Sequence, residues 1–210
     1  MKHGTTTSGL EAVWLMVEII SALSVLAYIT LFLILTLRTA HASGRSVWLF
    51  GKGVKQQVLP AFLFRISFVG AAVYSIVVLL ADREATDPIQ AAFEGPVSNL
   101  IGSVLAIAGS SLAFYSQVHM GRSWRIGAVA GELGRIVQTG PFAFSRNPVF
   151  VGQVLLFAGL LLASPNFVTL SLLLVLIVAV HLQVLIEERV LNEDLGDEYR
   201  IYCRKVRRWI

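Results

Sequence analysis

Long uncharged hydrophobic blocks alternate with short charged segments along this chain. The blocks lie at residues 10–37, 59–81, 97–118 and 148–186. A helix needs about 20 apolar residues to cross the hydrocarbon core of a bilayer, so each of the first three blocks predicts one membrane-spanning helix. The fourth block is too long for one span, and Ser164-Pro165-Asn166 near its middle predicts a turn. We therefore expect a helical hairpin there, with a short first arm, and about five spans in all.

The last segment, residues 187–210, is charged but keeps a regular apolar pattern. It carries six acidic and six basic residues. Apolar and aromatic positions recur in it every three or four residues, at Leu191, Leu195, Tyr199, Tyr202 and Val206. This spacing predicts an amphipathic helix lying on the cytoplasmic surface of the membrane, with Gly196 as a candidate break.

The overall composition agrees with a membrane protein. Hydrophobic residues make up 56% of the chain and charged residues 14%, and the mean hydropathy is +0.73. A soluble domain would carry about a quarter charged residues. The expected fold class is therefore an all-α integral membrane protein, with one compact membrane domain. The net charge of +4 follows from the preference of basic loops for the cytoplasm, so no nucleic-acid partner is expected.

The charges of the connecting loops predict an orientation. Residues 38–58 and 119–147 are basic, whereas residues 82–96 are acidic. Basic loops stay in the cytoplasm, so five spans place the N-terminus outside and the charged tail inside. The start, MKHGTTTSG, lacks the features of a signal peptide, so the first hydrophobic segment is expected to be retained. A multi-pass protein of the bacterial inner membrane or the endoplasmic reticulum is expected.

The cysteine and histidine content argues against a disulfide framework and a metal site. A single cysteine, Cys203, leaves no intrachain disulfide and no cysteine cluster for a metal. The four histidines show no ligand spacing, so no metal site is expected.

Three polar segments converge on the expected cytoplasmic face, at residues 119–127, 140–152 and 187–209. Each has a structural interpretation by itself. Trp124 and its neighbouring arginines are typical of an aromatic belt beside cytoplasmic charges. Arg146-Asn147-Pro148 is typical of a helix start. All three segments surround one uncharged hairpin, however, and this favours a shared site.

The order of motifs in these segments resembles a known family. The pattern GPF-x-F-x-RNP-x-F-x-G (residues 140–152) is followed by a hairpin and then by EE-x-x-L-x-x-x-x-G-x-x-Y-x-x-Y-x-x-x-V (residues 187–206). It resembles the isoprenylcysteine carboxyl methyltransferase family, which forms a wider group with the phospholipid N-methyltransferases. The upstream MGRSWRIG is also similar to a segment of these enzymes. The resemblance covers about residues 100–210.

The resemblance implies a membrane-embedded S-adenosylmethionine (SAM) site between the last spans and the tail, open to the cytoplasm. It implies a SAM-dependent carboxyl O-methyltransferase that acts on a lipophilic small molecule or on a prenylated or lipid-linked acceptor, which enters from the bilayer. A thiol, an amine or a phospholipid headgroup stays open as the methylated group, because nothing in the sequence selects the carboxylate over these. Residues 97–210 would form the methyltransferase core, and residues 1–96 would supply the first two spans. The remaining partners would be membrane lipids.

The resemblance also assigns roles to individual residues. Arg146, Glu188 and Arg208 are the expected catalytic residues, because a guanidinium binds a carboxylate through two hydrogen bonds and Glu188 can orient it. Trp124 and Arg125 are expected at the substrate. The expected cofactor-binding residues are Asn147, Pro148, Phe150, Gly152, Glu187, Tyr199 and Tyr202. Among these, Gly152 is expected to let the cofactor approach the helix backbone.

The sequence departs from the family pattern at three positions. Asn147 stands where many members have histidine, Phe150 where they have tyrosine, and Arg207 where they have proline. Because an asparagine does not titrate near neutral pH, general-base catalysis is excluded at residue 147. Two other polar residues inside the spans, Arg65 and His181, are read as structural, with Arg65 reaching the interface along its own stem.

Two other functions remain open on the sequence alone. Sterol-reductase-like membrane enzymes resemble this family in their C-terminal region and use NADPH, but they have around twice the spans. A non-catalytic membrane adaptor or carrier that keeps the fold is the other alternative. Transfer of a labelled methyl group would separate all three.

Overall fold

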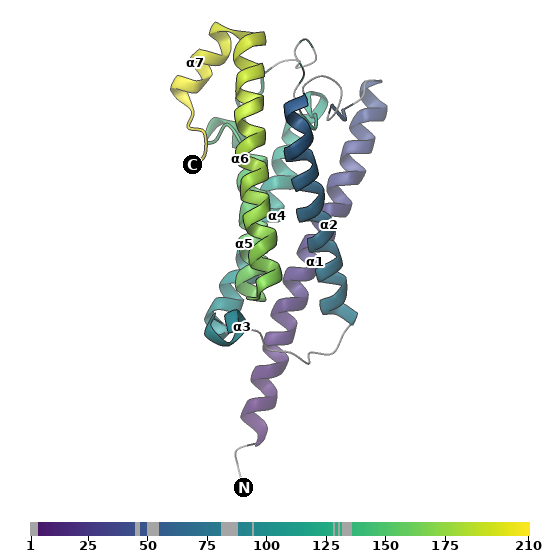
Figure 1. Cartoon of the computed structure of the whole chain (residues 1–210), viewed down its shortest axis with the longest axis vertical. Coiled ribbons are helices and arrows are strands. Elements are labelled where there is room, and N and C mark those ends of the chain that lie inside the picture. Colours follow the sequence, from purple (N-terminus) through teal and green to yellow (C-terminus); the bar gives the residue numbers. More distant parts are fainter. Residues whose placement is uncertain are drawn as a thin grey trace.

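The protein is a bundle of long helices in a computed structural model (Figure 1). The structure describes residues 4–44, 47–49, 55–80, 88–93, 95–127, 129, 131 and 136–210. The α-helices are α1 (Gly4–Ser43), α2 (Val58–Leu80), α3 (Pro88–Phe93), α4 (Pro96–Met120), α5 (Pro148–Ala163), α6 (Phe167–Leu195) and α7 (Asp197–Lys205). Short 3-10 turns occupy Lys55–Gln57, Gly121–Ser123 and Gly140–Ala143. Helices account for all the regular secondary structure in this described part, which confirms the all-α prediction.

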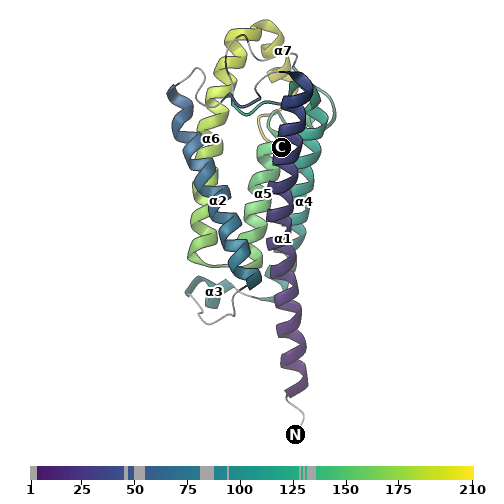
Figure 2. The same ribbon diagram turned by 90° about the vertical axis from the view of Figure 1, so that its right-hand side faces the viewer.

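The long helices run alternately up and down, so their connections lie at opposite ends of the bundle (Figures 1 and 2). α4 and α5 form the closest antiparallel pair, α1 lies along α4, and α2 packs against α6 and α1. α3 and the N-terminus lie at one end, whereas α7 and the C-terminus lie near the other. Helices from both sides of residue 97 therefore build a single bundle.

Four helices are long and apolar enough to cross a membrane, and they make the chain a multi-pass membrane protein. Within the described residues these are Leu15–Ser43, Lys55–Leu80, Pro96–Ser123 and Phe167–Leu195. The predicted fifth span corresponds to α5, which has 16 residues and a length of about 24 Å. That length falls short of a hydrocarbon core of about 30 Å. The count of five spans thus stays a prediction, and the short first arm of the hairpin is observed.

The turn of the hairpin is held by side chains. α5 ends at Ala163, and Asn166 caps α6: its side-chain oxygen accepts from the Thr169 amide at 3.0 Å, and the Thr169 hydroxyl accepts from the Asn166 amide at 3.2 Å. The Asn166 amide group also donates to the Tyr74 hydroxyl of α2 at 2.7 Å. The predicted break at Ser164-Pro165-Asn166 is confirmed, and it is tied to a third helix.

Four glycines bring α4 and α5 into backbone contact. A Cβ atom at Gly109 would lie 2.6 Å from the Gly152 carbonyl oxygen, and a Cβ at Gly152 would lie 2.6 Å from the Gly109 oxygen. Gly102 and Gly159 form a second such pair, at 2.7 and 2.6 Å. In a bilayer, where lipid is as apolar as a leucine side chain, close backbone packing of this kind drives helix association.

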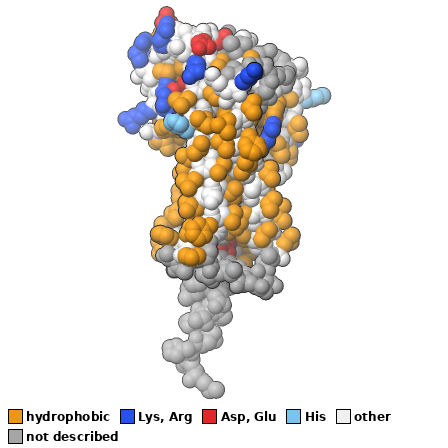
Figure 3. Space-filling model, viewed as in Figure 1, with side chains coloured by type: hydrophobic (Ala, Val, Ile, Leu, Met, Phe, Trp, Pro, Cys, Tyr) orange, Lys and Arg blue, Asp and Glu red, His pale blue; other side chains and the backbone are white. Residues whose placement is uncertain are grey.

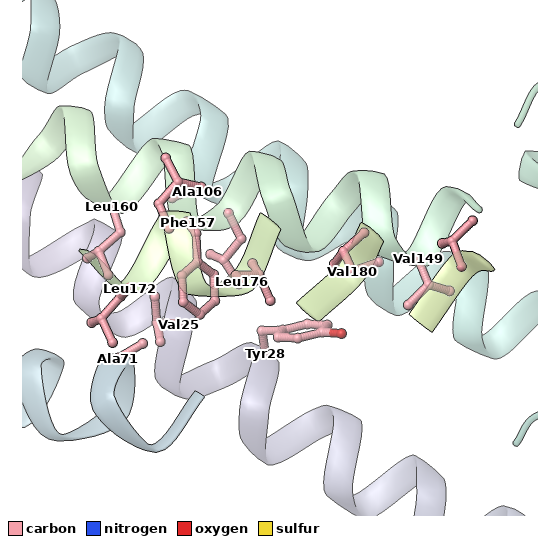
Figure 4. Packing of buried hydrophobic residues seen from close by; sticks show 14 of the residues in the cluster. Val25, Tyr28, Ala71, Ala106, Val149, Phe157, Leu160, Leu172, Leu176 and Val180 are labelled. Atoms are coloured by element: carbon pink, nitrogen blue, oxygen red, sulfur yellow. The ribbon is translucent and has the colours of Figure 1, made fainter. Parts of the chain in front are cut away.

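A hydrophobic core fills the space between the five long helices (Figure 4). Phe157 of α5 is buried at its centre, close to Val25 of α1 and Leu176 of α6. Its ring meets that of Phe68 from α2 edge-on, with centroids 5.1 Å apart. These contacts fix α2 and α6 relative to the α4–α5 pair.

α6 continues further than the hydrophobic pattern predicts. The sequence places the end of the last span at residue 186, but α6 runs without interruption to Leu195. Residues 187–195 contain neither glycine nor proline, so nothing local ends the helix. The break comes at Gly196, whose φ of 52° is left-handed and favours glycine. Glu187 and Glu188 therefore lie on the helix of the last span, and the predicted tail helix is confined to α7.

The charged segments gather at one end of the bundle, and hydrophobic side chains cover its middle (Figure 3). The two basic connections meet there, because the Ile126 amide donates to Val47 and the Leu49 amide donates to Ile126, both at 2.8 Å. Among the loop residues used to predict orientation, Arg45, Lys52, Asp82, Arg83, Glu84, Asp87, Glu94, Glu132 and Arg135 lie outside the described residues. Which side of the membrane this end faces stays a prediction.

Candidate functional site

A cavity of about 390 Å³ opens at the charged end of the bundle. This volume lies in the range of small-molecule sites. Its wall is formed by α1, α2, α5, α6, α7 and the segments around Trp124 and Phe142. The three polar segments singled out from the sequence therefore meet around one cavity, as predicted.

Glu188 holds two arginines from different segments. Its carboxylate accepts from Arg208 Nε at 3.0 Å and Nη2 at 2.6 Å, and it lies 3.2 Å from Arg146 Nη2. The side chains of Arg146 and Glu188 are only 13% and 16% exposed, so this pairing takes place largely away from water. The hydrogen-bonded carboxylate also raises the pKa of Arg208. Glu188 thus joins α6, the start of α5 and the C-terminal segment.

The C-terminal segment lies alongside the residues before α5. The Arg146 amide donates to the Arg207 carbonyl at 2.9 Å. The Asn147 side-chain nitrogen donates to the Arg208 carbonyl at 3.0 Å. Asn147 stands at the N-cap of α5 but makes no side-chain cap bond, which differs from the capping role that its position predicts. Its amide instead fastens the end of the chain beside the cavity.

Two further polar side chains of α6, Gln183 and Glu187, face the cavity. The Gln183 side-chain nitrogen donates to Glu187 Oε1 at 2.8 Å. A carboxylate can only accept, so the Gln183 oxygen must point away from it. That oxygen is buried and has no hydrogen-bond partner.

Burial lowers the pKa of Arg125, and the nearby carboxylates of Glu187 and Asp194 act in the opposite direction.

The inner part of the cavity is aromatic. Phe64 of α2 stacks on Phe150 of α5 with centroids 5.8 Å apart, and Tyr28 and Phe32 of α1 form the adjoining wall. Tyr28 accepts a hydrogen bond of 2.8 Å from the Gln153 side chain. The cavity therefore combines charged groups at the end of the bundle with an apolar interior between the helices.

Trp124 faces this site from its own segment. It is 7% exposed, its indole nitrogen donates to the Thr36 hydroxyl at 3.1 Å, and its ring meets Phe32 edge-on. A belt tryptophan would face the headgroups. The buried position therefore contradicts the aromatic-belt interpretation and places Trp124 in the cavity wall.

The tail tyrosines close the cavity from α7. Tyr199 and Tyr202 are buried together with Val206, and burial raises the pKa of Tyr202 to about 12 and that of Tyr199 further. The Tyr202 hydroxyl donates to the Phe142 carbonyl at 2.6 Å. Both tyrosines therefore stay protonated at neutral pH and form part of the wall, and Tyr202 also serves as a hydrogen-bond donor.

Replacing Tyr202 with phenylalanine is expected to destabilise the folded protein by about 1–2 kcal/mol, because the buried Phe142 carbonyl would lose its donor. The measurement is thermal unfolding in detergent, followed by intrinsic fluorescence. Tyr115→Phe is the control, since Tyr115 lies on the exposed surface of α4, and it should melt like the wild type. Equal melting of Tyr202→Phe and wild type would contradict the expectation.

The structure brings together most of the residues that the resemblance assigns to a site. The residues lining the cavity include Trp124, Arg125, Arg146, Asn147, Pro148, Phe150, Glu187, Glu188, Tyr199 and Tyr202. Arg208 reaches the site through Glu188. Gly152 does not line the cavity, because its missing side chain admits the backbone of α4 instead.

Sequence reasoning missed several lining residues. Gln153 and Gln183 are uncharged, so they do not interrupt the hydrophobic block, although a buried amide inside a span is itself a signal. Tyr28 and Phe68 lie in spans that carry no motif. Arg65, read as structural, also lines the cavity.

Part of the chain is similar to a known protein family. Residues 97–198 match the family model described as phospholipid methyltransferase. No curated protein matches the chain significantly, and no solved structure does so. The matched segment contains the α4–α5 pair, α6 and the residues Arg146, Asn147 and Glu188. Residues 97–198 are thus similar to the phospholipid methyltransferase group of membrane methyltransferases.

Proposed function

We propose that this protein transfers a methyl group from SAM to a lipophilic or lipid-linked acceptor, with a carboxylate as the nucleophile. The observation that carries this proposal is the single cavity in which charged residues from α5, α6 and the C-terminal segment meet an aromatic interior. Such a cavity suits a polar cofactor and an apolar acceptor that react at their boundary. The family match supports the reaction class.

The residues present fit the charges of SAM. SAM carries a cationic sulfonium, an ammonium group and a carboxylate. Glu187 and the buried, unpartnered oxygen of Gln183 supply acceptors for the ammonium group. The first turn of α5 presents the amides of Val149 and Phe150, which have no acceptor within the helix, to a carboxylate. Tyr199 and Tyr202 form a wall suited to the adenine ring.

Arg146 is the residue best placed to hold the acceptor carboxylate. Arg208 has both donors of its fork on Glu188. Arg146 lines the cavity, and its Nε is buried with no hydrogen-bond partner, although its other nitrogens contact Glu188 and Cys203. A free N–H on a fixed guanidinium can orient a carboxylate. Glu188 keeps that guanidinium in place.

When bound, SAM supplies an electrophilic methyl group on sulfur and leaves as a neutral thioether. The protein residues position the acceptor oxygen and exclude water from it, which is what a direct displacement requires. No residue needs to remove a proton from a carboxylate, so the absence of a titrating group at Asn147 is compatible with this reaction.

The proposal is tested with detergent-purified protein. We expect saturable binding of labelled SAM, and transfer of labelled methyl to a lipid-soluble product when membrane extract is added. A base-labile product would identify a carboxyl ester, and a base-stable product would move the acceptor to an amine or a thiol. If no SAM binds and no label is transferred, the proposal is wrong, and NADPH oxidation with sterol substrates would then test the reductase alternative.

A further inference from the structure

Arg65 is a charged residue in an unexpected place. It lies on α2 about two turns after Val58, where the helix begins, and hence about 10 Å along the helix axis. Phe62, Ile66 and Val69 around it are exposed, as expected of a lipid-facing helix. A charge at such a depth is costly and marks a functional site unless it is paired.

The side of α2 that carries Arg65 faces the cavity. The lining residues of this helix are Ala61, Phe64, Arg65, Phe68, Val69 and Ala72, which recur at helical spacing along one face. Arg65 and Val69 are also exposed, as is Leu33 of α1, another lining residue. Residues that are both lining and exposed mark the place where a cavity reaches the surface. The cavity therefore opens towards the lipid side between α1 and α2, and Arg65 lies at this opening.

The charges of the cavity leave Arg65 as a surplus cation. Its charged lining residues are three arginines and two glutamates: Arg65, Arg125, Arg146, Glu187 and Glu188. Glu188 pairs with Arg146, and the carboxylates of Glu187 and Asp194 act on Arg125. Within the stretches of chain that the structure describes, Arg65 has no ion-pair or hydrogen-bond partner. An occupant of the cavity would have to supply the missing anion.

We infer that Arg65 binds the anionic group, a phosphate or a carboxylate, of an amphiphile whose apolar chain lies along the aromatic wall of the cavity. The wall beside Arg65 consists of Phe64, Phe68 and Tyr28, which suits an alkyl or prenyl chain. Arg65 is thus a specificity-determining residue that selects acceptors with an anionic group at the lipid-side opening, in addition to the carboxylate that Arg146 would hold. That the bound amphiphile is an acceptor rests on the proposed function, whereas the binding of an anionic group by Arg65 does not.

The test measures binding of hexadecyl phosphate and of palmitate to the detergent-purified full chain by intrinsic fluorescence, since Trp48 and Trp124 line the cavity. Monopalmitoylglycerol is the uncharged probe. Arg65→Gln is expected to weaken binding of the anionic probes about tenfold and to leave the uncharged probe unchanged. Arg65→Lys is expected to restore part of the affinity, because it keeps the charge but not the fork. The ratio of the affinities for hexadecyl phosphate and palmitate shows whether the site prefers a phosphate or a carboxylate.

Arg200→Gln is the matched control, since Arg200 is exposed on α7 and pairs locally with Asp197. Two results would overturn the inference. If Arg65→Gln binds the anionic probes within twofold of wild type, Arg65 only reaches towards the interface. If it weakens the uncharged probe equally, Arg65 only shapes the cavity. SAM binding is measured in parallel: wild type that binds hexadecyl phosphate through Arg65 but binds no SAM would refute the proposed function and leave this inference standing.

Discussion

Glu188→Gln is expected to lower the rate of methyl transfer by about 100-fold or more, because it releases the arginine that would hold the acceptor carboxylate. The neutral amide can no longer hold Arg146 and Arg208, which approach the carboxylate at 3.2 and 2.6 Å. Removing one partner of a buried ion pair leaves an uncompensated charge and typically costs about 3–5 kcal/mol. Because Arg208 is 41% exposed, water screens part of this loss, and most of the cost falls on Arg146.

The same substitution should loosen the end of the chain. Trypsin is expected to cleave after Arg204 and Lys205 faster in Glu188→Gln than in wild type, because Arg208 then keeps only its backbone contacts with Ser145 and Asn147. The control is Glu193→Gln, an exposed carboxylate on the same helix, which should leave methyl transfer and proteolysis unchanged. The effects of Arg208→Gln should lie between those of Glu188→Gln and Glu193→Gln, because Arg208→Gln spares the contact of Glu188 with Arg146. Methyl transfer by Glu188→Gln within threefold of wild type would contradict the role given to this cluster.

Gly109→Ala is expected to destabilise the protein by about 3 kcal/mol, which corresponds to a fall in melting temperature of roughly 10 °C. The new Cβ would lie 2.6 Å from the Gly152 carbonyl oxygen. Backbone cannot move aside as a flexible side chain can, so α4 and α5 would have to separate. The measurement is thermal unfolding together with the monodisperse fraction after size-exclusion chromatography.

Gly95→Ala is the matched control, because a Cβ at Gly95 meets nothing within 4 Å. It should reduce stability by no more than a weakened helix start does, about 1 kcal/mol. Since Gly109 and Gly152 face each other, the double alanine variant should cost less than the sum of the single variants. If the stability losses of the two single variants were strictly additive, or if Gly109→Ala were as stable as wild type, α4 and α5 would not be held at this distance.

Much of the fold follows from local patterns. The hydrophobic blocks predict where the long helices lie, since burial in lipid requires a helix of sufficient length. The turn at Ser164-Pro165-Asn166 is predicted because its residues form caps and turns wherever they occur. The extension of α6 to Leu195 was missed, because hydrophobicity reports the membrane boundary, whereas the helix ends only where Gly196 allows a different backbone.

The site was predicted as a group of segments but not as a set of contacts. The convergence of Arg146, Glu188 and the tail follows from loop order alone. That Arg208 would engage Glu188 through both fork nitrogens depends on where α7 turns back, which no local pattern specifies. Gly152 was expected at the cofactor, yet Gly102 and Gly109 lie seven residues apart on one helix, as Gly152 and Gly159 do on the next, and small residues repeated on one helix face are a signal of a helix contact that could have been recognised.

The short length of α5 has a consequence for the kind of acceptor. α6 continues about two turns beyond Glu188 before it ends at Leu195, so the start of α5 lies in a recess below its neighbour. Such a recess has a lower effective dielectric constant than water, and separated charges are less stable there. Under the proposed function, a cationic donor and a carboxylate give two neutral products, so charge disappears during the reaction and the recess favours it. Attack by a neutral amine would keep a positive charge in the recess, and the depth of the site would therefore itself discriminate between nucleophiles.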